Sequence, residues 1–291
     1  MVRPVPRKRS RRKLKVEIAE HAGYCYGVER ALTLAKEAAR SKPPPIRTLG
    51  PIIHNPQVVK SLVKIGVEAV DSVEDLKSGT MIIRTHGVDP QVIIDARRRG
   101  IKVVDATCPF VAKAQKRAAA LKSEGYTVVI VGERNHPEVE GILSRVEGNA
   151  LVVEKASDVE QLGDKKVGVV VQTTQSVKNL KQIVSVLLPK TADLKVFNTI
   201  CSATSQRQAA ARKLADKADA MVVVGGKNSA NTTRLAQICL ERNPRTYHIE
   251  TAEELDPIWF EGCELVGLTA GASTPDWLLE EVREALASLG R

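Results

Sequence analysis

Three of the five cysteines stand where they could share one metal centre. Cys25 lies in "GYCYG", Cys108 in "DATCPF" and Cys201 in "TICSA", and successive members are 83 and 93 residues apart. Three thiolates suit an iron–sulfur cluster in which one iron has no protein ligand; that iron can act as a Lewis acid while the cluster supplies electrons. The alternatives are three unrelated buried thiols, or a zinc site completed by a histidine such as His54 or His86. The sequence has no C-x-x-C pair, which disfavours zinc, and Cys239 and Cys263 are interpreted as ordinary buried residues.

A possible acid–base pair follows the apolar run "YTVVIVG". The segment "ERNHPEVEG", residues 133–141, places His136 and Glu138 on either side of Pro137. A site that binds an anion and moves a proton would need such groups. The simpler interpretation of Glu138 is an acid in the first turn of a helix, where it interacts favourably with the helix dipole.

The elements that would carry these residues alternate along the chain. Strand-like runs such as "KVVDATC", "KVGVVVQT" and "DAMVVVGG" lead into polar turns and helical patterns. Repeated strand–turn–helix units predict parallel sheets covered by helices, with ligand sites beyond the carboxyl ends of the strands. His54, His86 and His136 fall on such ends, where free backbone N–H groups suit phosphate oxygens. Ser, Thr and Asn at these ends could also be plain N-caps.

Composition narrows the class of protein. The 291 residues carry a net charge of +10, but residues 1–13 hold seven basic side chains and no acid, which leaves about +3 on the rest. We expect a disordered basic leader there, and neither nucleic acid nor a membrane as a partner. No apolar run is long enough to span a bilayer. An odd cysteine count without an export signal predicts a reducing, cytoplasmic location.

The motifs taken together resemble a known family. The segments "GYCYGVERA", "GPIIHNPQVV", "VVDATCPFV", "NHPEVEG", "QTTQSV", "TICSATSQRQ", "VVGGKNSANTTRLA" and "TAGASTPD" follow one another in this order. From about Leu14 to the C-terminus the chain is similar to the LytB/IspH-type reductases of 4-hydroxy-3-methylbut-2-enyl diphosphate. The resemblance implies three similar α/β lobes with small, mostly parallel sheets, arranged as a trefoil around a central 4Fe–4S cluster, one per chain. The expected lobes are residues 14–108, 109–197 and 198–291.

The resemblance also implies an activity. The substrate would be (E)-4-hydroxy-3-methylbut-2-enyl diphosphate, an allylic alcohol diphosphate. It would lose its hydroxyl with two electrons and two protons, giving isopentenyl and dimethylallyl diphosphate at the last step of the non-mevalonate isoprenoid pathway. The sequence contains no G-x-G-x-x-G nucleotide fingerprint, so a reduced ferredoxin or flavodoxin is the expected electron donor.

Individual roles follow from the same resemblance. The cluster ligands would be Cys25, Cys108 and Cys201, and Glu138, Thr173 and His136 would be catalytic. Thr204 matches a further family hydroxyl near the cluster, and Thr174 could be an N-cap rather than a site residue. The diphosphate would be bound by His54, His86, His136, Thr173, Ser229, Ala230, Asn231 and Ser273. Ala230 stands where the family usually has a serine, and the lost hydroxyl is worth about 1 kcal/mol of binding.

Two other functions remain open at this point. Quinolinate synthase and the diphthamide-forming enzymes share a plan of three lobes and three cysteines, but they are not expected to carry "HPEVEG" together with "TAGAS". An iron–sulfur redox sensor whose basic tail binds nucleic acid would leave Glu138 without a purpose.

Overall fold

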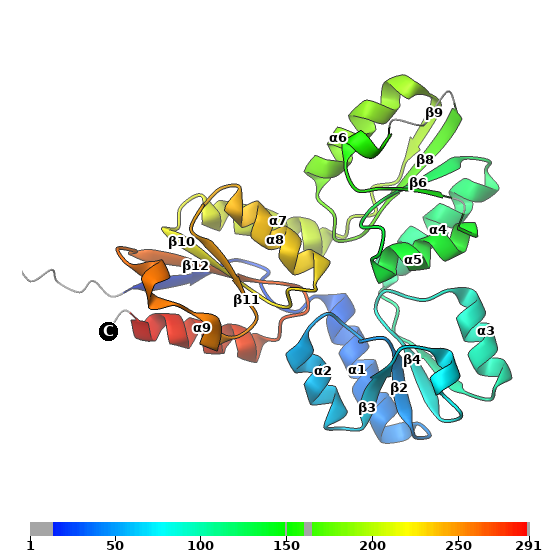
Figure 1. Ribbon diagram of the computed structural model, residues 1–291, viewed down its shortest axis with the longest axis horizontal. Helices are drawn as coiled ribbons and strands as arrows, with labels where there is room; N and C mark the ends of the chain where they lie inside the picture. The colour runs from blue at the N-terminus through cyan, green and yellow to red at the C-terminus, as the bar shows by residue number, and fades with distance from the viewer. Residues whose placement is uncertain (1–13, 149, 160–164, 290–291) are drawn as a thin grey trace, which may run out of the picture.

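The chain folds into three lobes, each built on a four-stranded sheet. The computed structural model describes residues 14–148, 150–159 and 165–289, so the expected leader, residues 1–13, lies outside the described residues. All strand pairs within the three sheets are parallel. The lobes surround a common centre (Figure 1). The predicted trefoil of α/β lobes is confirmed.

The first lobe has the strand order β3-β2-β4-β5. Its strands are β2 (Ile46–Leu49), β3 (Val67–Val70), β4 (Thr80–Ile83) and β5 (Lys102–Asp105), and its helices are α1 (Tyr26–Ser41), α2 (Pro56–Val63) and α3 (Pro90–Arg98). Alanines of α1, including Ala31 and Ala35, pack against Ile46 and Ile82 of the sheet. These small residues allow the helix to approach the sheet closely.

The second lobe has the order β7-β6-β8-β9. Its strands are β6 (Thr127–Val131), β7 (Ala150–Val153), β8 (Lys165–Val171) and β9 (Thr191–Val196), and its helices are α4 (Pro109–Ser123), α5 (Pro137–Leu143) and α6 (Val177–Leu187). Val129, Val169 and Ile183 lie in its core. Strands covered on both faces read as unbroken β-branched runs, which explains "VVIV" and "VGVVV".

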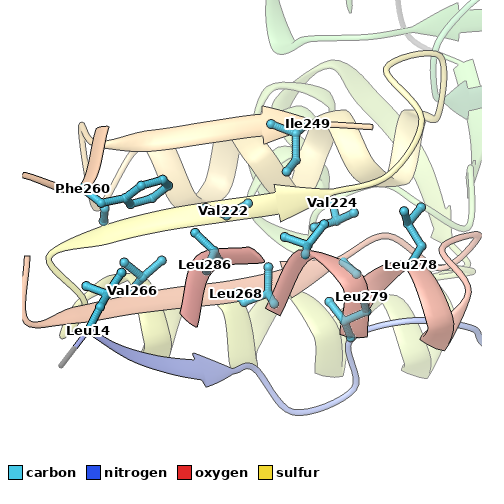
Figure 2. Packing of buried hydrophobic residues seen from close by; sticks show 13 residues of the cluster. Leu14, Val222, Val224, Ile249, Phe260, Val266, Leu268, Leu278, Leu279 and Leu286 are labelled. Carbon is cyan, nitrogen blue, oxygen red and sulfur yellow. The ribbon is translucent and has the colours of Figure 1, made fainter. Parts of the chain in front are cut away.

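The third lobe has the order β1-β12-β10-β11. Its strands are β1 (Lys15–Ile18), β10 (Ala220–Val224), β11 (Thr246–Ile249) and β12 (Leu265–Ala270), and its helices are α7 (Ser202–Ala215), α8 (Ala230–Leu240) and α9 (Asp276–Leu289). Figure 2 shows Val222, Leu268 and Leu286 packed in the core between the strands and α9. In the three lobes together, short 3-10 turns span Val73–Asp75, Ser144–Val146, Ala156–Val159, Leu188–Lys190, Ala252–Glu254 and Pro257–Phe260.

The N-terminal strand differs from the expected first lobe, residues 14–108. It pairs with β12, with Lys15 opposite Leu265 and Ile18 opposite Leu268, so residues 15–18 complete the third sheet (Figure 1, blue beside red). The pattern of "KLKVEIAE" predicts a strand but cannot indicate a partner strand about 250 residues away. The chain then enters the first lobe at α1, whose Val28 and Leu32 pack there.

Each of the three predicted cluster cysteines lies where the chain passes from one lobe to the next. Cys25 joins β1 to α1, Cys108 joins β5 to α4, and Cys201 joins β9 to α7. Helix α4 packs in the second lobe and α7 in the third. Three crossings between three lobes meet at the centre of a trefoil, and this explains why cysteines so far apart in sequence converge. None of the helices in the described ranges has the length and apolar composition that crossing a membrane would need.

Candidate functional site

The three cysteines occupy equivalent positions, each at the N-cap of a helix. Cys25, Cys108 and Cys201 precede α1, α4 and α7. Their backbone N–H groups donate to neighbouring loops: Cys25 to Ala272 O at 3.3 Å, Cys108 to Thr85 O at 2.9 Å and Cys201 to Thr173 O at 3.1 Å. All three side chains line one cavity of about 830 Å³, a volume that includes its open mouth. Three helix N-termini therefore direct their positive poles at the thiols, which favours negative charge there.

The space between the sulfur atoms is kept open by a glycine. A Cβ on Gly27 would lie 2.6 Å from Cys108 Sγ and 3.9 Å from Cys25 Sγ. Burial raises the pKa of Cys108, although the backbone N–H groups of Phe110 and Val111 act in the opposite direction, so its buried thiolate form needs a cationic partner. The donor chemistry therefore fits a metal group.

The spacing of the sulfur atoms argues against one zinc ion. A Zn–S distance of about 2.3 Å in a tetrahedron requires sulfurs about 3.8 Å apart. Among the described residues, the ligand atoms of His54, His86 and His136 all lie within 4.8 Å of one another. The three cysteines do not form such a group. The wider trio fits a cluster of several irons better than a single ion.

A buried carboxyl lines the same cavity. Glu138 is 2% exposed, and its carboxyl accepts two hydrogen bonds from Thr173, one from the backbone N–H to Oε1 at 2.7 Å and one from Oγ1 to Oε2 at 2.9 Å. Burial raises the pKa of Glu138 to about 7, although the bonds from Thr173 act in the opposite direction. The side chain can therefore hold a proton near neutral pH and exchange it with the Thr173 hydroxyl.

The neighbouring Thr174 is not an N-cap. Its Oγ1 accepts from Gln172 Nε2 at 3.0 Å, whereas Ser176 caps α6 by accepting from Asn179 N–H at 3.1 Å. Both threonines line the cavity, but Thr173 is the one bonded to Glu138.

Three histidine rings that line the cavity form a cluster. The ring centroids of His54 and His86 are 4.6 Å apart, and that of His136 lies 5.6 and 5.3 Å from them, respectively. His136 Nδ1 accepts from Glu138 N–H at 3.1 Å, so the neutral ring carries its hydrogen on Nε2. His54 Nε2 and His86 Nδ1 are buried without a partner in the described structure.

Burial controls the charge of these rings. It lowers the pKa of His136 to about 4, with further contributions from His54 and Arg84. It also lowers the pKa of His54 and, more strongly, that of His86. The imidazoles are neutral, two have a ring nitrogen without a partner, and the half-buried guanidinium of Arg84 acts on them electrostatically. They are suited to an entering anion, which would satisfy the free ring nitrogens and favour their protonation.

The remaining polar candidates lie at the start of α8 and in the loop after β12. Ser229 caps α8 by accepting from Thr232 N–H at 3.4 Å, which leaves its hydroxyl hydrogen for a ligand. Asn231 Nδ2 is buried and unpartnered among the described residues. Ser273 Oγ donates to His54 O at 3.0 Å, so its expected donation to a phosphate would require that bond to break. Ala230 offers only its backbone at this end of the helix.

Every residue predicted for the site lines this one cavity. Its lining includes Cys25, Cys108, Cys201, His54, His86, His136, Glu138, Thr173, Thr204, Ser229, Ala230, Asn231 and Ser273. His248 lies elsewhere and contacts Gly225 O at 2.9 Å, and Cys239 is buried in α8 outside the lining.

Arg207 also lines the cavity but was not among the predicted site residues. Its position could have indicated its burial, because it follows Thr204 by three residues and precedes Ala211 by four. That spacing places it on the apolar face of the predicted helix.

Comparisons with known proteins agree on a family. The model of the LytB protein family matches residues 16–287. A 4-hydroxy-3-methylbut-2-enyl diphosphate reductase of Geobacter sulfurreducens is 53% identical over 274 residues, which are 94% of this chain and 97% of that protein. One of the same name from Syntrophotalea carbinolica is 51% identical over 280 residues, covering 96% and 100% of the two chains.

Two solved structures are also similar. A structure described as (E)-4-hydroxy-3-methyl-but-2-enyl diphosphate reductase, the terminal enzyme of the non-mevalonate pathway, is 48% identical with a TM-score of 0.70 and covers 94% of this chain and 99% of its own. The E-1-hydroxy-2-methyl-but-2-enyl-4-diphosphate reductase of Plasmodium falciparum is 29% identical with a TM-score of 0.88, covering 94% and 87%.

Proposed function

The chain belongs to the LytB protein family, and from this premise we propose that it reduces (E)-4-hydroxy-3-methylbut-2-enyl diphosphate to isopentenyl and dimethylallyl diphosphate. It is an oxidoreductase of the terminal step of the non-mevalonate pathway. Membership of this family favours that activity over the quinolinate synthase and redox-sensor hypotheses.

One observation supports the proposal most directly. A single cavity combines three convergent thiols, a buried carboxyl of raised pKa and a group of under-bonded donors. The substrate offers a matching feature for each, because it has an alcohol to be removed, an apolar allyl chain and a diphosphate.

We infer that Cys25, Cys108 and Cys201 hold one 4Fe–4S cluster. When bound, it would supply electrons one at a time and an open iron that acts as a Lewis acid. The helix N-termini of α1, α4 and α7 would stabilise its negative charge. A reduced ferredoxin or flavodoxin as donor, and a cytoplasmic location, stay predictions from the sequence.

The diphosphate would bind at the histidine cluster of the cavity. His54, His86 and His136 provide ring nitrogens, and Ser229 and Asn231 add a hydroxyl and an amide at the N-terminus of α8. This arrangement would leave the alcohol end of the substrate toward the cysteines and Glu138.

Glu138 would be the proton source for cleavage of the C–O bond. Hydroxide is a poor leaving group, so the departing oxygen takes one proton and leaves as water; the second proton is added to the allyl carbon skeleton, and two electrons balance the reaction. The 2.9 Å bond from Thr173 Oγ1 to Glu138 Oε2 provides a short path along which a proton can pass to the substrate oxygen. Because the donor form is protonated, the rate should fall as the pH rises through the pKa of Glu138, about 7.

The test is anaerobic purification followed by counting of iron and sulfide, a visible spectrum, and turnover of the allylic diphosphate with a reduced dye. We expect about four irons per chain, and loss of most iron and activity in Cys108→Ser. Cys239→Ser is the matched control, since Cys239 is buried outside the cavity. A colourless wild type that stays inactive after cluster reconstitution would contradict the proposed function.

A further inference from the structure

Arg207 is a buried cation that the roles described so far do not use. It lies on α7, is 2% exposed, and donates from Nη2 to Gly23 O at 2.7 Å. Gly23 belongs to the turn that leads into Cys25, so the guanidinium connects the helix that begins after Cys201 with the loop that carries a second cysteine.

Most of the hydrogen-bonding capacity of Arg207 is unused. Its Nε and Nη1 are buried without a partner in the part of the chain that the structure describes. A buried guanidinium that lacks an anionic partner is strongly unfavourable, because desolvation removes the hydration of its charge. A purely structural bond to one carbonyl would not require a charged side chain with five donors.

Among the described residues, no carboxylate pairs with Arg207. None of the ion pairs found among them includes this arginine. The groups that favour its charged form are the thiols of Cys25 and Cys201, while burial acts in the opposite direction and lowers the pKa of Arg207. Arg207 also lines the cavity into which these thiols face.

We propose that Arg207 is the internal counter-cation of the cysteine-bound cluster and sets its reduction potential, an inference that rests on the proposed function. Reduction by one electron from the external donor adds one negative charge to a cluster with three thiolate ligands. A fixed positive charge in a poorly solvated cavity stabilises the reduced form more than the oxidised form. Net charge, hydrogen bonding and exposure to solvent are the properties by which a protein adjusts such potentials.

The experiment compares Arg207→Gln, which removes the charge, with Arg207→Lys, which keeps it. Arg145→Gln is the matched control, because Arg145 is half-buried, donates to Val88 O at 3.3 Å and to Gln115 Oε1 at 3.0 Å, and has an unpartnered Nε, yet does not line the cavity. Each protein is purified anaerobically, its iron is counted, and the substrate-free cluster is titrated by spectroelectrochemistry.

At the midpoint potential of the wild type, we expect the ratio of reduced to oxidised cluster to be at least tenfold lower in Arg207→Gln. This corresponds to a midpoint potential lowered by about 59 mV or more for a one-electron couple. Arg207→Lys should stay within about threefold of the wild type, as should Arg145→Gln. An unchanged midpoint in a cluster-loaded Arg207→Gln would overturn the inference, as would an equal shift in Arg207→Lys.

Two further outcomes are also decisive. If Arg207→Gln does not fold or does not retain iron, Arg207→Lys decides: a midpoint within threefold of the wild type supports the role of charge, and a tenfold shift overturns it. A wild type without iron would overturn the proposed function together with this inference, whereas a normal wild-type cluster with an unmoved Arg207→Gln potential would overturn this inference alone.

Discussion

The buried carboxyl of Glu138 should reduce the stability of the folded chain at neutral and alkaline pH. Its pKa rises from the usual 4.5 to about 7 in the folded chain, mainly because of burial. One pKa unit corresponds to about 1.4 kcal/mol, so ionisation should destabilise the fold by about 3 kcal/mol. Because the pKa is higher in the folded chain than in the unfolded chain, the protonated carboxyl contributes its full stabilisation below pH 4.5. That contribution is lost as the pH rises through 7.

Replacement of Glu138 by Gln separates this effect from packing. The amide has the same shape, can accept from Thr173 N–H and can donate to Thr173 Oγ1, so both hydrogen bonds of the carboxyl are retained. At pH 8 we expect Glu138→Gln to exceed the wild type in free energy of unfolding by about 3 kcal/mol, and at pH 5 by less than about 1 kcal/mol. Turnover should nevertheless fall by about a hundredfold or more, since the proton donor is gone.

The assay is anaerobic urea unfolding followed by circular dichroism at both pH values, on preparations of equal iron content. His136, whose pKa is lowered to about 4, loses its stabilising contribution as the pH falls from 6.5, but it does so equally in both proteins and cancels in the difference. Glu140→Gln, on the same helix but with a side chain 60% exposed, should follow the wild type at both pH values. A Glu138→Gln protein that is no more stable than the wild type at pH 8, or that shows the same difference at pH 5, would refute the reasoning.

Two further predictions concern the cysteine and histidine groups of the cavity. Gly27→Ala would place a Cβ 2.6 Å from Cys108 Sγ, so the variant should lose most of its iron; a full iron content would show that the sulfur can move aside without consequence. Binding of inorganic pyrophosphate should be accompanied by proton uptake at the histidines and should be tighter at pH 6 than at pH 8. Burial lowers the pKa of His54, His86 and His136 in the free protein, and a bound anion would raise it. Calorimetry in buffers of different ionisation enthalpy measures this uptake, and identical heats in those buffers would contradict it.

Local patterns in the sequence predicted much of the fold. The run "YTVVIVG" corresponds to β6, and the turn after it begins α5 at Pro137, because proline is favoured in the first turn of a helix and cannot continue a strand. Cys25, Cys108 and Cys201 follow strands and precede helices as expected. These features depend on residues that are near neighbours along the chain, so they can be read without coordinates.

Other features depend on partners far away in the sequence. The pairing of β1 with β12 inside the third lobe, and the bond between Thr173 and Glu138 inside the second, join residues that are far apart in sequence and meet only when each lobe folds. The burial that raises the pKa of Glu138 and isolates Arg207 is a property of the packed surroundings, not of the residue type. The sequence by itself determined which chemical groups stand at the ends of strands. Tertiary packing alone decided which of them share a desolvated cavity, because desolvation and charge coupling depend on distances in space rather than along the chain.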